Sequence, residues 1–136
     1  MFCSMSSDQI PVVAAVIADG ENVLVCKRPA QKRHGELWEF PGGKVLPGES
    51  FEAALSRELL EELDVSLTAV GSTLFTSPDP DSPFVIHFIE VSIAGTPSAI
   101  EHTELSWSRF EDLDLGTLAP SDRAFVQYYL HGATED

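Results

Sequence analysis

Three glutamates, Glu58, Glu61 and Glu62, lie close together in the segment RELLEEL of a strongly acidic chain. In a helix, residues three and four apart share a face, so these three carboxylates should project together. At a separation of roughly 6 Å and an effective dielectric constant near 20, each pair of like charges costs about 3 kcal/mol. Either this helix face is fully solvated, where the cost is small, or the carboxylates bind a positive ion.

The residues before the helix favour the second interpretation. Hard divalent cations such as Mg²⁺ take oxygen ligands, usually a few carboxylates together with carbonyl groups, waters and substrate phosphates. The pair Gly42-Gly43 leaves backbone carbonyls unshielded, so Gly42 is a candidate ligand through its C=O. Arg57, next to Glu58, can hold a carboxylate in place through a bidentate pair of hydrogen bonds.

The element that carries the glutamates is predicted as a helix from about Ser50 to Leu63. Ser50 is a favourable N-cap after a Pro-Gly turn. An apolar stripe at helical spacing should pack on the core and is formed by Phe51, Ala54, Leu55, Leu59 and Leu63. Asp64 follows at a position where helices often end in a left-handed residue, which aspartate tolerates better than most residues.

The remaining pattern predicts strands at 10–18, 22–28, 37–40, 70–76, 84–93 and 105–110. Asp19-Gly20 is a hairpin turn signal between the first two strands, and Pro41-Gly42-Gly43 should end the third. A second helix is predicted at 121–130 with Ser121 as its cap. Strands interspersed with two helices indicate an α/β (α+β) fold, an α/β/α sandwich with a mixed sheet between helices.

The length of 136 residues fits one domain, which we expect at 9–131, between a disordered lead at 1–8 and a tail at 132–136. The N-terminal stretch has neither a basic start nor an apolar run, so we do not expect a secretory signal. No run approaches the roughly 20 apolar residues of a membrane helix, so no membrane partner is expected. Two cysteines, Cys3 and Cys26, cannot form a disulfide framework, which favours a reducing, cytoplasmic compartment.

A formal net charge of −14 argues against binding of a nucleic acid polymer. It does not exclude a small phosphorylated ligand whose charge is neutralised locally. Five of the eight basic residues lie between positions 27 and 44 and are Lys27, Arg28, Lys32, Arg33 and Lys44. They form either ordinary solubilising charge at a hairpin end or an anion-contacting rim beside the acidic helix.

The spacing from Gly43 to Val65 resembles the 23-residue Nudix box, with Glu49 and RELLEELDV in register. The Nudix family usually has glycine where this chain has Asp64, and at a helix end we expect this to cost stability more than activity. Outer motifs are similar to the MutT-type (deoxy)nucleoside triphosphate pyrophosphohydrolases, which include CTP pyrophosphohydrolase and 8-oxo-dGTP diphosphatase. These motifs are RPAQ at 28–31, LWEFPGGKV at 37–45, EH at 101–102 with Trp107, and LAPSD at 118–122.

The resemblance implies Mg²⁺-dependent hydrolysis of a triphosphate to a nucleoside monophosphate and pyrophosphate, with Mn²⁺ as a substitute metal. It implies that Glu58 and Glu62 are metal ligands, that Glu61 ligates directly or through water, and that Gly42 adds its carbonyl. Glu101 is implied as a further metal ligand or as the base, against the alternative of an ordinary loop acid. Arg57 belongs to the implied catalytic set, and Glu49 can orient it.

For the substrate side the resemblance implies contacts from Arg28, Glu39 and Lys44 and a base pocket lined by Phe40, although core packing is the common role of such a phenylalanine. Asp122 is implied to read the base edge, with a simple helix N-terminal aspartate as the alternative. An ionised aspartate only accepts hydrogen bonds, which would favour bases with an exocyclic amino group. His102 is interpreted as a structural histidine.

Two other functions stay open at this point. The same chemistry can act on ADP-ribose or dinucleoside polyphosphates, although the short chain and LAPSD weigh against this. A Nudix fold can also bind a nucleotide or metal without turnover, although such a module would not need so many mutually repelling carboxylates. Both a monomer and a homodimer are compatible with the sequence.

Overall fold

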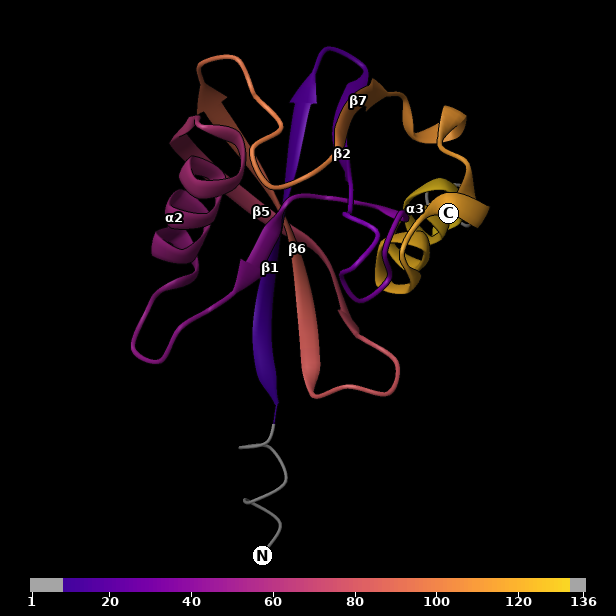
Figure 1. Cartoon of the computed structure of the whole chain (residues 1–136), viewed down its shortest axis with the longest axis horizontal. Helices are drawn as coiled ribbons and strands as arrows, with labels where there is room; N and C mark the ends of the chain where they lie inside the picture. Colours follow the sequence, from indigo (N-terminus) through magenta and orange to yellow (C-terminus); the bar gives the residue numbers. More distant parts are fainter. Residues whose placement is uncertain (1–8, 133–136) are drawn as a thin grey trace, which may run out of the picture.

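Residues 9–132 are described by the computed structural model of this chain (Figure 1). They open with the strands β1 (Ile10–Asp19) and β2 (Asn22–Lys27), which pair antiparallel across the predicted Asp19-Gly20 turn. The predicted lead at 1–8 and positions 133–136 of the predicted tail lie outside the described residues. No helix within residues 9–132 is both long and apolar enough to cross a membrane.

The sheet is mixed, as predicted. Strand β1 runs parallel to β6 (Phe84–Ala94) and antiparallel to the short strand β4 (Gly42–Lys44). Strand β5 (Ser66–Pro78) pairs antiparallel with β6, while β3 (Trp38–Glu39) and β7 (Glu104–Ser108) both pair with β2. The strand order is therefore β3-β2-β1-β6-β5, with β4 on β1 and β7 on β2.

The two helices, α2 (Phe51–Leu63) and α3 (Pro120–Gly132), lie on opposite sides of the strands (Figure 1). Two separate apolar clusters confirm this arrangement, because one is built with α2 and the other with α3. Two short 3₁₀ turns, η1 (Phe110–Asp112) and η2 (Leu115–Thr117), lead into α3. The predicted α/β/α sandwich is confirmed.

Local signals account for most of α2. The Ser50 hydroxyl accepts a hydrogen bond from the Ala53 amide at 3.0 Å, as expected of an N-cap. The helix ends at Asp64, whose φ of 58° and ψ of 42° are left-handed, as predicted. The predicted stripe is fully buried except for Phe51, which remains partly exposed and packs against the His87 ring.

The third predicted strand ends before Pro41, as expected, but the sequence did not predict that the chain re-enters the sheet at Gly42 as β4. Two glycines let the backbone approach β1 there, where a Cβ on Gly42 would collide with the Val13 carbonyl. Two expectations about element boundaries were wrong. Strand β5 is longer than predicted and contains register shifts. Helix α3 starts at Pro120, which suits a first helical position, so Ser121 lies inside the first turn and is not the cap.

Candidate active site

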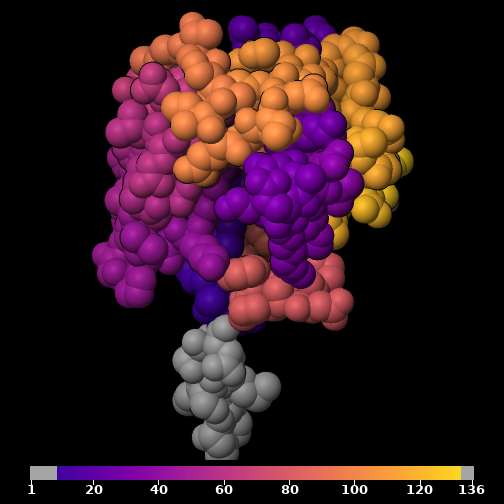
Figure 2. Space-filling model, in the orientation of Figure 1, coloured from indigo at the N-terminus to yellow at the C-terminus, as the bar shows by residue number. Residues whose placement is uncertain are grey.

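A cavity of about 420 Å³ lies between α2, the loop that follows β2, and the segment that leads into β7. In Figure 2 it appears as a hollow bounded by these three segments. Its lining combines acidic, basic and glycine residues and consists of Arg28, Pro29, Lys32, Glu39, Gly42, Gly43, Lys44, Leu46, Glu58, Glu62, Glu101 and His102. The cavity therefore gathers most of the residues that the sequence analysis singled out.

Arg57 organises the acidic side of this cavity. Its guanidinium donates to both carboxylate oxygens of Glu49, each at 2.9 Å, and to Glu58 Oε2 at 2.8 Å. The hydrogen bonds from Arg57 lower the pKa of Glu49 to about 2. Arg57 also donates to the Lys44 carbonyl at 3.0 Å, which ties the helix to the end of β4. Arg57 and Glu49 therefore position Glu58, as the sequence suggested.

Glu62 and Glu58 form a close pair of acids. The Glu62 side chain is only 5% exposed, and its Oε1 is buried without a hydrogen-bond partner. Burial, followed by the hydrogen bond and the negative charge of Glu58, raises the pKa of Glu62 well above its ordinary value. A Cβ on Gly43 would collide with the Glu58 carboxylate, so glycine is required for this carboxylate to lie against β4.

These residues fit a hard divalent cation. Within residues 9–132 no three His, Cys, Asp or Glu side chains are already gathered as a metal-binding group. However, Glu58, Glu62 and Glu101 line one cavity together with Gly42, and one Glu62 oxygen is buried and unpaired. Carboxylate and carbonyl oxygens are the ligands that Mg²⁺ prefers, and a cation would remove the mutual repulsion of the acids.

Glu61 is placed differently from the other two helix glutamates. Its side chain is 52% exposed, and its Oε1 lies 3.7 Å from Arg57 Nη1. It does not line the cavity that contains Glu58 and Glu62. The shared helix face therefore carries two enclosed acids, Glu58 and Glu62, and one solvated acid, Glu61.

A second cavity of about 430 Å³ adjoins the first and shares Arg28, Lys32, Glu39, Gly43 and Lys44 with it. Its other lining residues come from β1, the loop after β2, the loop before β6, β6 and the start of α3, and they are Val12, Arg33, His34, Asp79, Phe84, Ile86, Ala119, Ser121 and Asp122. The shared basic residues thus stand between an acidic cavity and a more apolar one.

Glu39 joins the two cavities through hydrogen bonds. Arg28 Nη1 donates to Glu39 Oε1 at 2.9 Å, and His102 Nε2 lies 2.8 Å from Glu39 Oε2. His102 Nδ1 is 3.9 Å from Glu62 Oε1, and both atoms are buried without a hydrogen-bond partner. His102 therefore lies between Glu39 and Glu62 and is held by a hydrogen bond to Glu39, which fits its interpretation as a structural histidine.

Asp122 lines the second cavity. Its Oδ2 accepts a hydrogen bond from the Phe40 amide at 2.9 Å. Burial, followed by the negative charge of Glu39, raises the pKa of Asp122 well above its ordinary range. Burial therefore disfavours the ionised form of Asp122, which the sequence could not show because nothing in it marks this carboxyl as enclosed.

The Phe40 ring does not line either cavity. It is 3% exposed and packs in an aromatic cluster with Phe88, Phe110 and Phe125. The alternative of core packing therefore describes the ring, and Phe40 meets the site only through its backbone amide.

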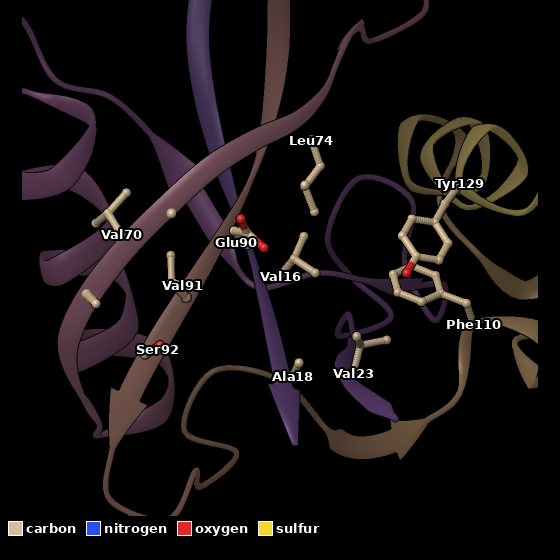
Figure 3. Close-up of a pocket in the computed structure, with 12 residues that line it drawn as sticks. Val16, Ala18, Val23, Val70, Leu74, Glu90, Val91, Ser92, Phe110 and Tyr129 are labelled. Atoms are coloured by element: carbon tan, nitrogen blue, oxygen red, sulfur yellow. The ribbon is translucent and has the colours of Figure 1, made fainter. Parts of the chain in front are cut away.

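A larger hollow of about 510 Å³ lies elsewhere, between β5, β6 and the start of β2, as shown in Figure 3. Its lining is mainly apolar, and its one carboxylate, Glu90, accepts a hydrogen bond from the Ser72 amide at 3.1 Å. Phe110 and Tyr129 stack on each other along one wall, with ring centroids 3.9 Å apart. It offers no cluster of acids or bases, so we do not place the chemistry there.

Comparison with known proteins identifies the family of this chain. Residues 8–129 match the NUDIX domain family. The chain is 39% identical to the CTP pyrophosphohydrolase of Escherichia coli over 124 residues, which cover 89% of this chain and 91% of the relative. It is 36% identical to the putative 8-oxo-dGTP diphosphatase 2 of Mycobacterium tuberculosis over 118 residues, which cover 85% of this chain and 84% of the relative.

Solved structures show the same fold. The solution structure of the Escherichia coli ORF135 protein matches with a TM-score of 0.76 at 37% identity and covers 93% of this chain and 92% of that one. The crystal structure of a MutT NUDIX hydrolase from Burkholderia pseudomallei matches with a TM-score of 0.79 at 26% identity. This match covers 88% of this chain and 96% of that one. The chain therefore belongs to the NUDIX domain family, and it is a MutT-like Nudix hydrolase.

Proposed function

We propose that this protein hydrolyses (deoxy)nucleoside triphosphates to a nucleoside monophosphate and pyrophosphate, with Mg²⁺ as its metal. The observation that carries the proposal is the pair of adjoining cavities, one lined by Glu58 and Glu62 and the other lined by Asp122. The rim that they share carries Arg28, Lys32 and Lys44. The names of the two relatives above support the same substrate class.

The charges explain why a metal belongs in this reaction. A triphosphate brings about four negative charges, and both the chain as a whole and this site are acidic. A bound Mg²⁺ neutralises phosphate charge and acidifies a water molecule. The Glu58 and Glu62 carboxylates, the Gly42 carbonyl and Glu101 would hold it. Glu61 is assigned a contact through water, because its side chain is exposed and does not line the cavity.

The basic rim would bind and orient the phosphates. Arg28 is held at a fixed position by Glu39, and Lys44 lies over the Phe84 ring at 5.1 Å from its centroid. Lys32 lines both cavities. These three cations offset the negative charge of the substrate on the side opposite the helix acids. The overall charge of −14 argues that the substrate is a free nucleotide and not a nucleic acid polymer.

Asp122 is proposed as the residue that reads the base. It lines the second cavity together with the rim residues Arg28 and Glu39. Its carboxyl oxygens can accept hydrogen bonds from an exocyclic amino group of a base. Cytidine triphosphates and 8-oxo-dGTP are the proposed preferred substrates, after the named relatives.

The test is release of monophosphate and pyrophosphate with Mg²⁺ across CTP, dCTP, dGTP, 8-oxo-dGTP, ATP, UTP and ADP-ribose. Glu58→Gln and Glu62→Gln should each lower kcat by orders of magnitude while the fold persists. Glu52→Gln is the matched control, because Glu52 lies in the first turn of the same helix and is exposed. Activity on ADP-ribose alone, or unchanged turnover in the Glu58 and Glu62 variants, would overturn the proposal.

A further inference from the structure

Asp79 forms a buried junction that the proposed chemistry does not use. It is 8% exposed and lies in the loop between β5 and β6. Its carboxylate accepts hydrogen bonds from Arg33 Nη1, from Ser121 Oγ at 3.0 Å and from Ser82 Oγ at 3.1 Å. Burial alone would raise the pKa of Asp79, but the hydrogen bonds from Arg33, Ser121 and Ser82 outweigh it, and the pKa is lowered.

Arg33 extends this junction into the basic loop at 28–36. Its Nη2 donates to the Pro80 carbonyl at 3.0 Å, so its guanidinium contacts the β5–β6 loop at two points. The Arg33 carbonyl in turn accepts a hydrogen bond from Arg28 Nε at 2.6 Å. Since Arg28 also pairs with Glu39, one continuous chain of contacts links Asp79 to the rim of the phosphate cavity.

Ser121 extends the junction in the other direction, to the start of α3. It is 4% exposed and directly precedes Asp122, the proposed base reader. Asp79, Arg33, Ser121 and Asp122 all line the second cavity. One carboxylate therefore bonds to two segments, 28–36 and the first turn of α3, that form facing parts of the proposed nucleoside site.

We propose that Asp79 is a positioning residue that holds the basic loop at a fixed distance from Asp122 and thereby sets the base selectivity of the site. This inference rests on the proposed function. The distance between the phosphate-binding cations and the base reader determines which base can reach Asp122 while its phosphates lie on the rim. Breaking the junction changes selectivity and KM, while the acids on α2 keep their own contacts to Arg57.

Two single variants release the two sides of the junction. Arg33→Ala removes the loop contact, and Ser121→Ala removes the helix contact. Each should lower the ratio of kcat/KM between the preferred and the poorest nucleotide of the panel by about 10-fold, with a raised KM and little change in kcat. Because both act through Asp79, the double variant should lose less than the product of the two single losses.

Arg109→Ala is the matched control. Arg109 also forms ion pairs, with Asp112 and Glu111, and its side chain is 46% exposed compared with 44% for Arg33, but it lines neither cavity. The exchanged pair Arg33→Asp with Asp79→Arg preserves the combined length of the two side chains and should restore part of the selectivity. An unchanged selectivity ratio in both single variants would overturn the inference.

Hydrogen exchange separates this inference from the proposed function. Arg33→Ala should speed amide exchange at 28–36 and also in the first turn of α3, although Arg33 does not touch that helix. If the wild-type protein hydrolyses no nucleotide of the panel, the proposed function fails on its own. Exchange in α3 that is unaffected by Arg33→Ala then shows that Asp79 does not couple the two segments, which would also overturn the inference.

Discussion

Replacing Glu62 with glutamine should stabilise the metal-free protein at neutral pH. Burial, with the hydrogen bond and charge of Glu58 as the next causes, raises the pKa of Glu62 from 4.5 to about 10. In the unfolded chain the same carboxyl ionises near pH 4.3. Folding at neutral pH must therefore protonate the Glu62 carboxyl. The contribution of this carboxyl to the free energy of unfolding is fully present below about pH 4 and is lost as the pH rises toward the folded pKa.

The size of this effect follows from the unfolded state. At pH 7 the medium is about 2.7 units above the pKa of the unfolded carboxyl, and each unit is worth 1.36 kcal/mol, which gives about 4 kcal/mol. The result does not depend on the exact folded pKa as long as that value lies above 7. Glutamine has the same shape and no proton to take up, so it should avoid this cost. For a domain of this size the gain corresponds to roughly 10 °C in Tm.

Thermal unfolding in EDTA between pH 5 and pH 8 measures the difference. The Tm advantage of Glu62→Gln should be small at pH 5 and should grow steadily to pH 8, while the exposed control Glu52→Gln follows the wild type. Adding Mg²⁺ should raise the Tm of the wild type more than that of Glu62→Gln. Parallel pH curves for the wild type and Glu62→Gln would refute the reasoning.

Three further predictions concern the elements that support the site. Leu59→Ala, at a fully buried position on α2, should lower the free energy of unfolding by about 2–5 kcal/mol in urea titrations, and a loss below 1 kcal/mol would contradict the packing described here. Asp64→Gly should raise that free energy by about 1 kcal/mol with unchanged kcat, because glycine adopts the left-handed conformation without a steric cost. Gly43→Ala should push the Glu58 carboxylate aside and weaken Mg²⁺ binding by about 10- to 100-fold in metal titrations. Gly132→Ala, where an added Cβ meets only Tyr128 at ordinary van der Waals distance, should leave the metal affinity unchanged.

The helix that carries the acids was predictable because its determinants are local. The cap at Ser50, the apolar stripe and the left-handed end at Asp64 each depend on residues within a few positions along the chain. Strand β4 was not predictable, because three residues carry no periodicity and their pairing partner in β1 is about 30 positions away in the sequence.

The same limit applies to the individual glutamates. Helical spacing places Glu61 and Glu62 on one face but does not determine which of them is covered. The segment after β6 covers Glu62, since the Ile100 amide donates to the Glu62 carbonyl at 3.1 Å and His102 follows beside its carboxyl. Glu61 lies outside this cover and stays in solvent. The junction at Asp79 was equally hidden, because it joins three segments that are distant in sequence.

The enclosed pair of acids connects stability with the proposed function. A metal-free protein that keeps Glu62 buried gives up about 4 kcal/mol at neutral pH, compared with a total stability of roughly 5–15 kcal/mol for a typical domain. Binding of a cation at 100 times its dissociation constant contributes about 2.7 kcal/mol, which offsets most of that loss. An exposed pair of acids would avoid the cost, but water would screen its attraction for a cation. The burial that destabilises the empty site is therefore the same feature that would let Glu58 and Glu62 hold a metal ion against a triphosphate.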